Sequence, residues 1–149
     1  MLKKQKSYYE TQPEKGWVHL DASDQVLGRF ASTVAFVLLG KHKVNYTPGA
    51  KTGHAVVVTN VEKIKITGRK MDQKSYYRHS RYPGNLKEIQ LKDMFQNKPD
   101  NVLREAIKTM LPHNKQTKDL MGRLRIYVGA AHPHQAQKPE SILLERRKA

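Results

Sequence analysis

The spacing of apolar residues along the first third of the chain predicts a strand, a helix and a second strand. Residues 17–21, WVHLD, alternate apolar and polar positions in the manner of a half-buried strand. From Val26 to Leu38 apolar residues recur at helical spacing, and Gly40 is a suitable end for that helix. The run AVVVT at 55–59 is β-branched and largely apolar, so we expect a central strand covered on both faces.

The rest of the chain continues this alternation of strands and helices. Residues 63–67, KIKIT, alternate and predict a strand, with which KSYYR at 74–78 is expected to form a hairpin. The remaining predicted elements are a helix over 91–97, a helix from Pro99 that Pro112 stops, and a strand over 124–128.

Strands separated by helical patterns predict an α/β fold, a three-layer α/β/α sandwich with a largely parallel central sheet and basic projecting loops. A chain of 149 residues suits one domain. We expect that domain over 17–129, between a basic N-terminal arm at 1–16 and an extended C-terminal tail at 130–149. The residues expected to be buried together are Val34, Val37, Leu38, Val57, Ile107 and Met110.

The net charge of the chain reduces the number of functions that the sequence allows. Lysine and arginine number 28 against 13 acids, which gives a formal net charge of +15 and a pI near 10.1. So much positive charge repels itself unless a polyanion neutralises it, which favours a nucleic-acid partner.

Other compositional features exclude several classes of protein. Cysteine is absent, which excludes disulfides, thiolate zinc sites and a cysteine nucleophile, and favours an intracellular protein. The longest mostly apolar run, residues 30–39, is far below the roughly 20 residues that span a bilayer, so we expect no membrane segment. The polar and basic start of the chain predicts no secretory signal.

The loop GKHKVNYTPGAKTGH, residues 40–54, combines glycines and basic residues with no acid, as phosphate-binding loops often do. It fails the P-loop pattern, because His42 follows Gly40 and Lys41 where that motif needs a different spacing and a hydroxyl residue. A dinucleotide site is also excluded, because the turn after the first strand has one glycine, Gly28. Since the loop follows a helix, its amides do not converge at a helix start, and it suits a polymer backbone better than one nucleotide.

Three basic clusters therefore predict an RNA-binding surface. Cations would contact successive phosphates, and tyrosines among them would stack on unpaired bases. Structural alternatives stay open: Tyr46 packs on the helix end while Gly49 and Gly53 shape a turn, the second cluster is a solvated hairpin, and the third is a solvated helix face. The predicted RNA-binding residues are Lys41, His42, Lys43, Tyr46 and Lys51 in the loop, Arg69, Lys70, Lys74, Tyr76, Tyr77, Arg78, His79 and Arg81 in an arm, and Lys115, Lys118 and Arg123 near the end.

The sequence gives only weak indications of catalytic or metal-binding residues. His132 and His134 come without cysteine or a carboxylate pair, so we assign no metal, and no cofactor is expected. Asp21 and Glu62 are the carboxylates that an enzyme on this scaffold would use, although each is also typical of a capping or surface carboxylate.

Short motifs follow one another in a fixed order from Trp17 to Pro139. They are Trp17, Asp21-Ala22, Leu27-Gly28-Arg29, Gly40 to Lys43, Tyr46-Thr47-Pro48, Val61-Glu62-Lys63, Thr67-Gly68, Tyr76-Tyr77, Met110-Leu111-Pro112, Arg125 to Gly129, His132 and Gln135 to Pro139. This series resembles that of the large-subunit ribosomal protein thirteen family of bacterial type. The resemblance implies a three-layer α/β/α protein without catalytic activity that binds large-subunit ribosomal RNA, contacts neighbouring ribosomal proteins and supports subunit assembly. It implies a place in cytoplasmic ribosomes, or in those of an organelle.

The chain departs from the family pattern at two places. Gly53-His54 stands where the family commonly has Gly-Asp, and Lys108-Thr109 where it has Lys-Gly. Two other functions stay open from the residues alone: a nucleotide-dependent enzyme, and a DNA-binding or generic nucleic-acid chaperone. We expect no membrane partner and no homo-oligomer.

Overall fold

A parallel four-stranded sheet forms the centre of the molecule in the computed structural model, which describes residues 16–141. Its strands are β1 (Trp17–Asp21), β2 (Ala55–Thr59), β5 (Leu124–Ile126) and β6 (Glu140–Ser141). The order across the sheet is β5-β2-β1-β6, and every neighbouring pair runs parallel. This arrangement confirms the α/β class and the parallel sheet.

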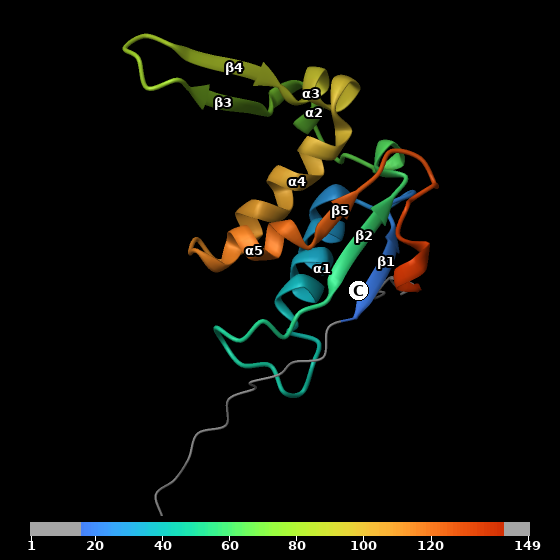
Figure 1. Ribbon diagram of the computed structural model, residues 1–149. Coiled ribbons are helices and arrows are strands. Elements are labelled where there is room, and N and C mark those ends of the chain that lie inside the picture. The colour runs from blue at the N-terminus through green and yellow to red at the C-terminus, as the bar shows by residue number, and fades with distance from the viewer. Residues whose placement is uncertain (1–15, 142–149) are drawn as a thin grey trace, which may run out of the picture.

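Helices connect these strands and pack beside them (Figure 1). The first, α1 (Leu27–Leu39), ends at Gly40, whose φ of 79° is left-handed and lets its N–H bond the carbonyls of the last turn. The other helices are η1 (Val61–Lys63), α2 (Lys70–Gln73), α3 (Leu91–Asn97), α4 (Pro99–Met110), α5 (Gln116–Gly122) and η2 (Gln135–Gln137).

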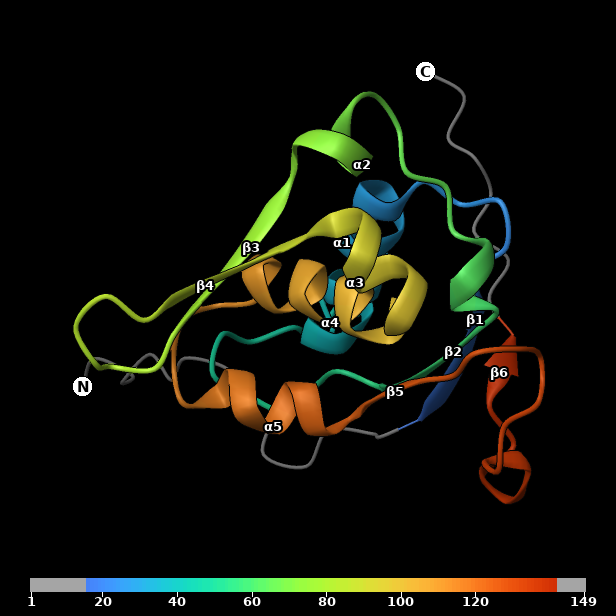
Figure 2. The same cartoon turned by 90° about the horizontal axis from the view of Figure 1, so that it is seen from above.

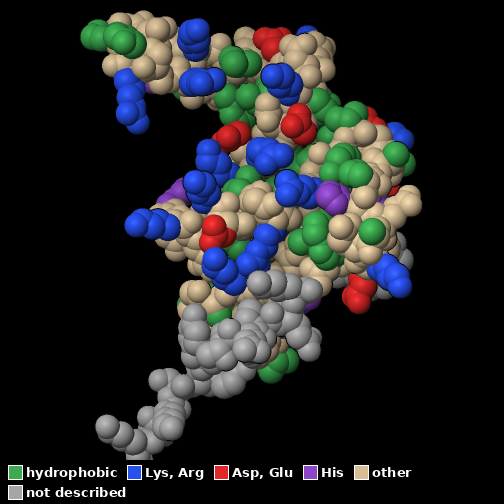
Figure 3. Space-filling view, viewed as in Figure 1, with side chains coloured by type: hydrophobic (Ala, Val, Ile, Leu, Met, Phe, Trp, Pro, Cys, Tyr) green, Lys and Arg blue, Asp and Glu red, His purple; other side chains and the backbone are tan. Residues whose placement is uncertain are grey.

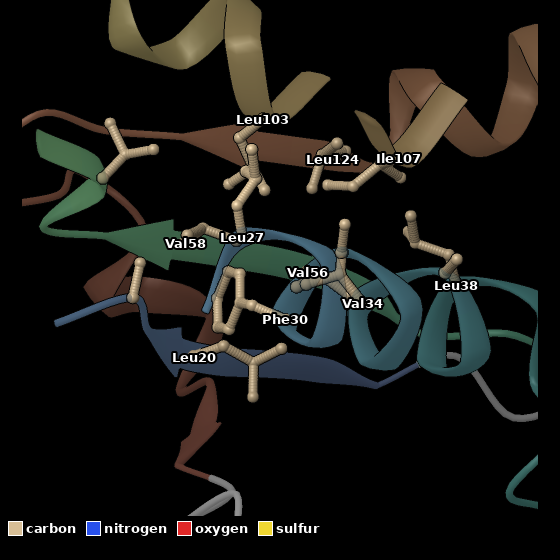
Figure 4. Close-up of a cluster of buried hydrophobic side chains, with 14 of the residues drawn as sticks. Leu20, Leu27, Phe30, Val34, Leu38, Val56, Val58, Leu103, Ile107 and Leu124 are labelled. Carbon is tan, nitrogen blue, oxygen red and sulfur yellow. The ribbon is translucent and has the colours of Figure 1, made fainter. Parts of the chain in front are cut away.

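The apolar core lies between α1, α4 and one face of the sheet. Val18 and Leu20 of β1 alternate onto this face, where Val56 and Val58 are their partners on β2. Figure 4 shows the ring of Phe30 of α1 close to Leu20 of β1, and both side chains are buried. The labelled members of this cluster are Leu20, Leu27, Phe30, Val34, Leu38, Val56, Val58, Leu103, Ile107 and Leu124.

Five of the six predicted core residues are buried, and one prediction is wrong. Val34, Val37, Leu38, Val57 and Ile107 are buried, although Val57 lies on the other face of the sheet. Met110, the last residue of α4, has 43% of its surface exposed, because it lines a shallow groove beside Phe36 that is open to solvent. Helical periodicity places Met110 on the apolar face but does not say whether another element covers that end of the helix.

The opposite face of the sheet is covered by the segment after β5. The rings of Trp17 and His134 stack with centroids 5.1 Å apart, and those of His19 and His132 lie 5.3 Å apart. Figure 2 shows α1 and α4 on one side of the sheet and this segment, with η2, on the other. Because β6 pairs with β1, the sheet includes residues beyond 129, the predicted end of the domain.

Two strand predictions were wrong. Residues 63–67 form no regular strand. Lys65 makes an isolated bridge with Val26, and Lys63 is the last residue of η1. The strand β3 (Ser75–His79) therefore pairs with the later strand β4 (Leu86–Gln90) and not with 63–67. The last strand is also shorter than predicted, because β5 ends at Ile126.

The other predicted elements are confirmed, and parts of the predicted arm and tail lie outside the described part of the chain. The helix over 91–97 has the predicted bounds, and Pro99 is the first residue of α4. The helix α5 was not among the predicted elements, although a solvated helix face was an open alternative for the third basic cluster. Nearly all of the predicted arm at 1–16, and the last eight residues of the predicted tail, lie outside the described residues.

Candidate nucleic-acid interface

The glycines of the 40–54 loop close its base against the end of α1. A methyl group added at Gly53 would lie 1.7 Å from the carbonyl oxygen of Leu38, and one added at Gly40 would lie 2.6 Å from the hydroxyl of Thr52. Thr52 is fully buried and donates its hydroxyl to the carbonyl of Leu39 at 3.3 Å. Gly40 and Gly53 therefore allow two backbone segments to touch, which a phosphate-cradling loop does not require.

The loop carries its basic residues outward from this closed base. Lys41, His42 and Lys51 are exposed, and Lys43 is half-buried. Tyr46 is also half-buried, so its ring is neither fully available to a base nor part of the core. Cations on a loop whose ends are held together remain at fixed separation, which suits a ligand that is itself folded.

Histidine rings line one side of the loop. His54 accepts a hydrogen bond from the backbone N–H of Gly16 at its Nδ1, 2.8 Å away, and its ring centroid lies 4.9 Å from that of His42. Burial, followed by the nearby His54 and Lys43, lowers the pKa of His42. His54 therefore makes its contacts within the protein, next to Gly16, the residue before β1.

The loop and α5 are joined by two polar contacts. Lys51 Nζ lies 2.6 Å from Asp119 Oδ2, and the guanidinium of Arg123 donates to the carbonyl of Gly53 at 3.1 Å. The hydrogen bond and charge of Lys51 lower the pKa of Asp119. Two basic clusters that are far apart in sequence therefore form one continuous surface, while Lys51 and Arg123 also have structural partners.

The second basic cluster extends from the start of α2 into the hairpin of β3 and β4. The ring of Tyr76 packs against the core, with Lys74 Nζ 5.1 Å from its centroid. Burial, and then the charge of Glu105, raises the pKa of Tyr76. The neighbouring Tyr77 has 63% of its surface exposed, so the two adjacent tyrosines have different roles. The other predicted residues of this cluster, Arg69, Lys70, Arg78, His79 and Arg81, are all exposed.

The structure thus joins the first and third clusters and places the second apart from them. In Figure 1 the hairpin projects at the top and the 40–54 loop lies at the bottom, with α5 between them. Figure 3 shows lysine and arginine side chains on the hairpin and on the body below it, with a hollow between them. A curved basic face of this kind can contact phosphates from two directions.

One exposed cation in this region was missed by the sequence analysis. Lys87 of β4 lies directly opposite Arg78 of β3 in the antiparallel register. It was missed because residues 86–90 were not predicted to be a strand. Recognition that 80–85, with Pro83 and Gly84, form the turn of a hairpin would have found it.

The two candidate catalytic carboxylates are occupied by local hydrogen bonds. Asp21 accepts from the backbone N–H of Ser23 at 2.9 Å and from Asn60 Nδ2 at 3.0 Å. Burial alone would raise the pKa of Asp21, but these hydrogen bonds outweigh it and lower the pKa. The backbone N–H of Gly129 donates to Glu62 at 3.0 Å and lowers the pKa of that carboxyl. Both side chains hold turns next to the sheet.

The histidines of the C-terminal segment also have partners within the protein. His134 Nε2 and the hydroxyl of Tyr127 share a hydrogen bond of 2.8 Å, and the backbone N–H of His134 donates to His132 Nδ1. Between residues 16 and 141 no three histidine, cysteine or acidic side chains are grouped as metal ligands would be. In that same range no helix is long and apolar enough to cross a membrane.

Comparison with known proteins identifies relatives along most of the chain. Residues 15–133 match the model of a family described as ribosomal protein L13. A protein named large ribosomal subunit protein uL13 from Thermotoga maritima is 48% identical over 131 residues, 88% of each chain. The proteins of the same name from Aquifex aeolicus and Chloroflexus aggregans are 50% and 48% identical, over 87% and 93% of this chain and 90% and 98% of theirs.

Proposed function

Because the chain belongs to the ribosomal protein L13 family and is a structural constituent of the large ribosomal subunit, we propose that its basic face binds folded ribosomal RNA of that subunit. The family is one of structural ribosome components, which agrees with the expectation that the protein is not an enzyme. Ribosomal RNA and neighbouring ribosomal proteins are accordingly its partners. The role in subunit assembly is part of this proposal, as is attachment in a single copy.

One observation supports the proposal more than any other: the link between the 40–54 loop and α5. The ion pair of Lys51 with Asp119 and the hydrogen bond from Arg123 to Gly53 hold two basic segments side by side. Exposed cations of both segments, such as Lys41 and Lys118, then share one surface. Two segments held side by side lose little backbone freedom on binding, so their cations favour a polyanion of fixed shape over a flexible one.

The mechanism is architectural. Side-chain cations neutralise phosphates that crowd together where RNA folds, and the counterions that they displace enter solution. Recognition is of shape, because the deep major groove of an RNA helix is closed to side chains. The residues that we propose as RNA contacts remain those predicted from the sequence, with Lys51, Tyr76 and Arg123 contributing also through their contacts within the protein.

Salt-dependent binding tests this function directly. Replacing Lys41 and Lys43 by glutamine should weaken binding to a large-subunit RNA fragment and reduce the slope of log affinity against log salt by about one unit or slightly more. The same change at Lys115 and Lys118 should have a similar effect if both segments contact the RNA. Glutamine at Lys63 and Lys138, in η1 and at the end of η2, removes the same charge elsewhere and serves as the control.

Two results would contradict the proposal. An unaltered salt slope in both loop and α5 variants would show that this surface does not contact RNA. Equal affinity for duplex DNA and for the large-subunit fragment would favour a generic nucleic-acid chaperone. Sedimentation of tagged protein with large subunits through a sucrose gradient at moderate salt tests the same function in the cell.

A further inference from the structure

Two cations lie directly opposite each other near the turn of the β3–β4 hairpin. Arg78 pairs with Lys87 in the antiparallel register, and both residues are exposed. Side chains at directly opposite positions share one face and have Cβ atoms about 4.5–5.5 Å apart, and like charges there destabilise the strand pair. Among residues 16–141, no acidic side chain forms a salt bridge with either of them.

The hairpin has few other contacts to offset this repulsion. Its two strands form a separate sheet that is not joined to the four-stranded one, and all five residues of β4 are exposed. A two-stranded hairpin on its own is at best marginally stable in water. Two opposed cations therefore weaken the hairpin unless an anion lies against them.

The nearest acid of the hairpin lies on its other face. Side chains alternate along a strand, so Arg78 shares its face with Tyr76, two residues earlier, and with its partner Lys87. Glu88 is paired with Tyr77 on the opposite face and accepts a hydrogen bond from the hydroxyl of Tyr77 at 3.3 Å. The hairpin thus separates its cations from its carboxylate.

The cationic face of the hairpin is turned toward the body of the protein. Tyr76 packs against the core, and Glu105 of α4 is close enough to influence its pKa. Arg78 and Lys87 follow on the same face as Tyr76. Figure 3 shows a hollow beneath the hairpin, and we infer from the position of Tyr76 that this face borders it. Across this hollow lie lysine and arginine side chains of the body, with a few acidic side chains among them.

We propose that Arg78 and Lys87 together form a phosphate-binding pair that holds the backbone of an RNA strand in the hollow beneath the hairpin. This inference rests on the proposed RNA-binding function and adds to it a contact, Lys87, and a direction of approach. Arginine can bind a phosphate through two parallel hydrogen bonds while lysine supplies a point charge. A phosphate between them removes their repulsion, so RNA binding and stability of the hairpin are coupled.

The change Lys87→Glu separates this role from a structural one. It replaces a repulsion by an attraction to Arg78, so amide hydrogens of residues 75–79 and 86–90 should exchange more slowly in the free protein. The same change should weaken binding to the large-subunit RNA fragment by about tenfold or more near 0.1 M salt and reduce the salt slope by about one unit. If Lys87 served folding alone, its replacement would make these amide hydrogens exchange faster.

The control is Lys138→Glu, which makes the same change of charge at the end of η2, on the other side of the sheet. A loss of affinity equal to that of Lys87→Glu would show an effect of net charge alone and overturn the inference. Faster amide exchange in the Lys87 variant would also overturn it.

Inorganic phosphate distinguishes an RNA site from a general anion site. If phosphate alone shifts the amide resonances of residues 78 and 87 while the Lys87 variant binds RNA like the wild type, the pair is not an RNA contact. Failure of the wild-type protein to bind the RNA fragment would overturn the proposed function and this inference together. Binding by the wild type with no loss in the variant would overturn this inference alone.

Discussion

Replacing Gly53 by alanine tests whether the glycines of the 40–54 loop serve the fold. The added methyl group would lie 1.7 Å from the carbonyl oxygen and 2.5 Å from the carbonyl carbon of Leu38. A close carbon–oxygen contact is about 3.3 Å, so the loop and the end of α1 would have to separate by about 1.6 Å. The atoms in conflict belong to two backbones, so no side-chain rotation can relieve the overlap.

The expected cost follows from the contacts that this separation disturbs. Overpacking of this kind destabilises by about 1–3 kcal/mol. The hydrogen bonds from Thr52 to Leu39 and from Arg123 to Gly53 add about 0.5–1.5 kcal/mol each if they are lost. We therefore expect Gly53→Ala to lower the free energy of unfolding by about 2–6 kcal/mol. Each kcal/mol lost should lower the melting temperature by about 2–4 °C.

Urea unfolding followed by the fluorescence of Trp17 measures this change, because Trp17 is the single tryptophan and stacks on His134. Gly28→Ala is the matched control: beyond its chain neighbours and the backbone of its own helix, no atom lies within 4 Å of the added methyl group, and Gly28 lies in the first turn of α1. Alanine there should be neutral or stabilise by up to about 1 kcal/mol. If Gly53→Ala unfolds at the same urea concentration as the wild type, the close approach of the loop to α1 is wrong.

Further predictions concern the core and the ionisable groups. Leu38→Ala should cost about 2–5 kcal/mol because Leu38 is fully buried, whereas Met110→Ala should cost less than about 1.5 kcal/mol; equal losses in urea unfolding would refute the assignment of the core. In an NMR titration the pKa of the Asp119 carboxyl should lie below 3.8 and rise in Lys51→Gln, and no rise would contradict the ion pair. Burial lowers the pKa of His19 below its usual 6.5, so this imidazole binds a proton at higher pH in the unfolded protein than in the folded one. Protonation therefore favours the unfolded state, and the free energy of unfolding should fall as the pH drops below about 6.5. An equal fall in a His19→Gln variant would contradict this.

The sequence pattern alone predicted the elements that depend on neighbouring residues in the chain. The helical spacing up to Leu38 and the left-handed glycine at 40 define α1, and the β-branched run at 55–59 defines the central strand. Net charge likewise depends on composition alone, and it correctly favoured a nucleic-acid partner over an enzyme substrate. These features need no knowledge of which segments meet in space.

The features that only tertiary structure decided depend on contacts between distant segments. Residues 63–67 have the alternation of a strand but find only Val26 as a bridge partner, while residues 75–79 pair with a strand later in the chain. Alternation reports that one face is apolar and cannot name the partner that completes the hydrogen bonds. Met110 shows the same limit, because amphipathic spacing does not show whether anything covers the end of a helix.

For the candidate RNA-binding surface, too, some features followed from the sequence and others only from the tertiary structure. Its cations were identified from the sequence, because lysine and arginine among polar residues remain exposed in almost any fold. Their arrangement was not: the ion pair of Lys51 with Asp119 joins residues far apart in the chain, and the opposition of Arg78 and Lys87 depends on strand register. Electrostatic interaction depends on distance in space, so the sequence determined which charges the protein carries, and only the folded chain decided which of them face a common ligand.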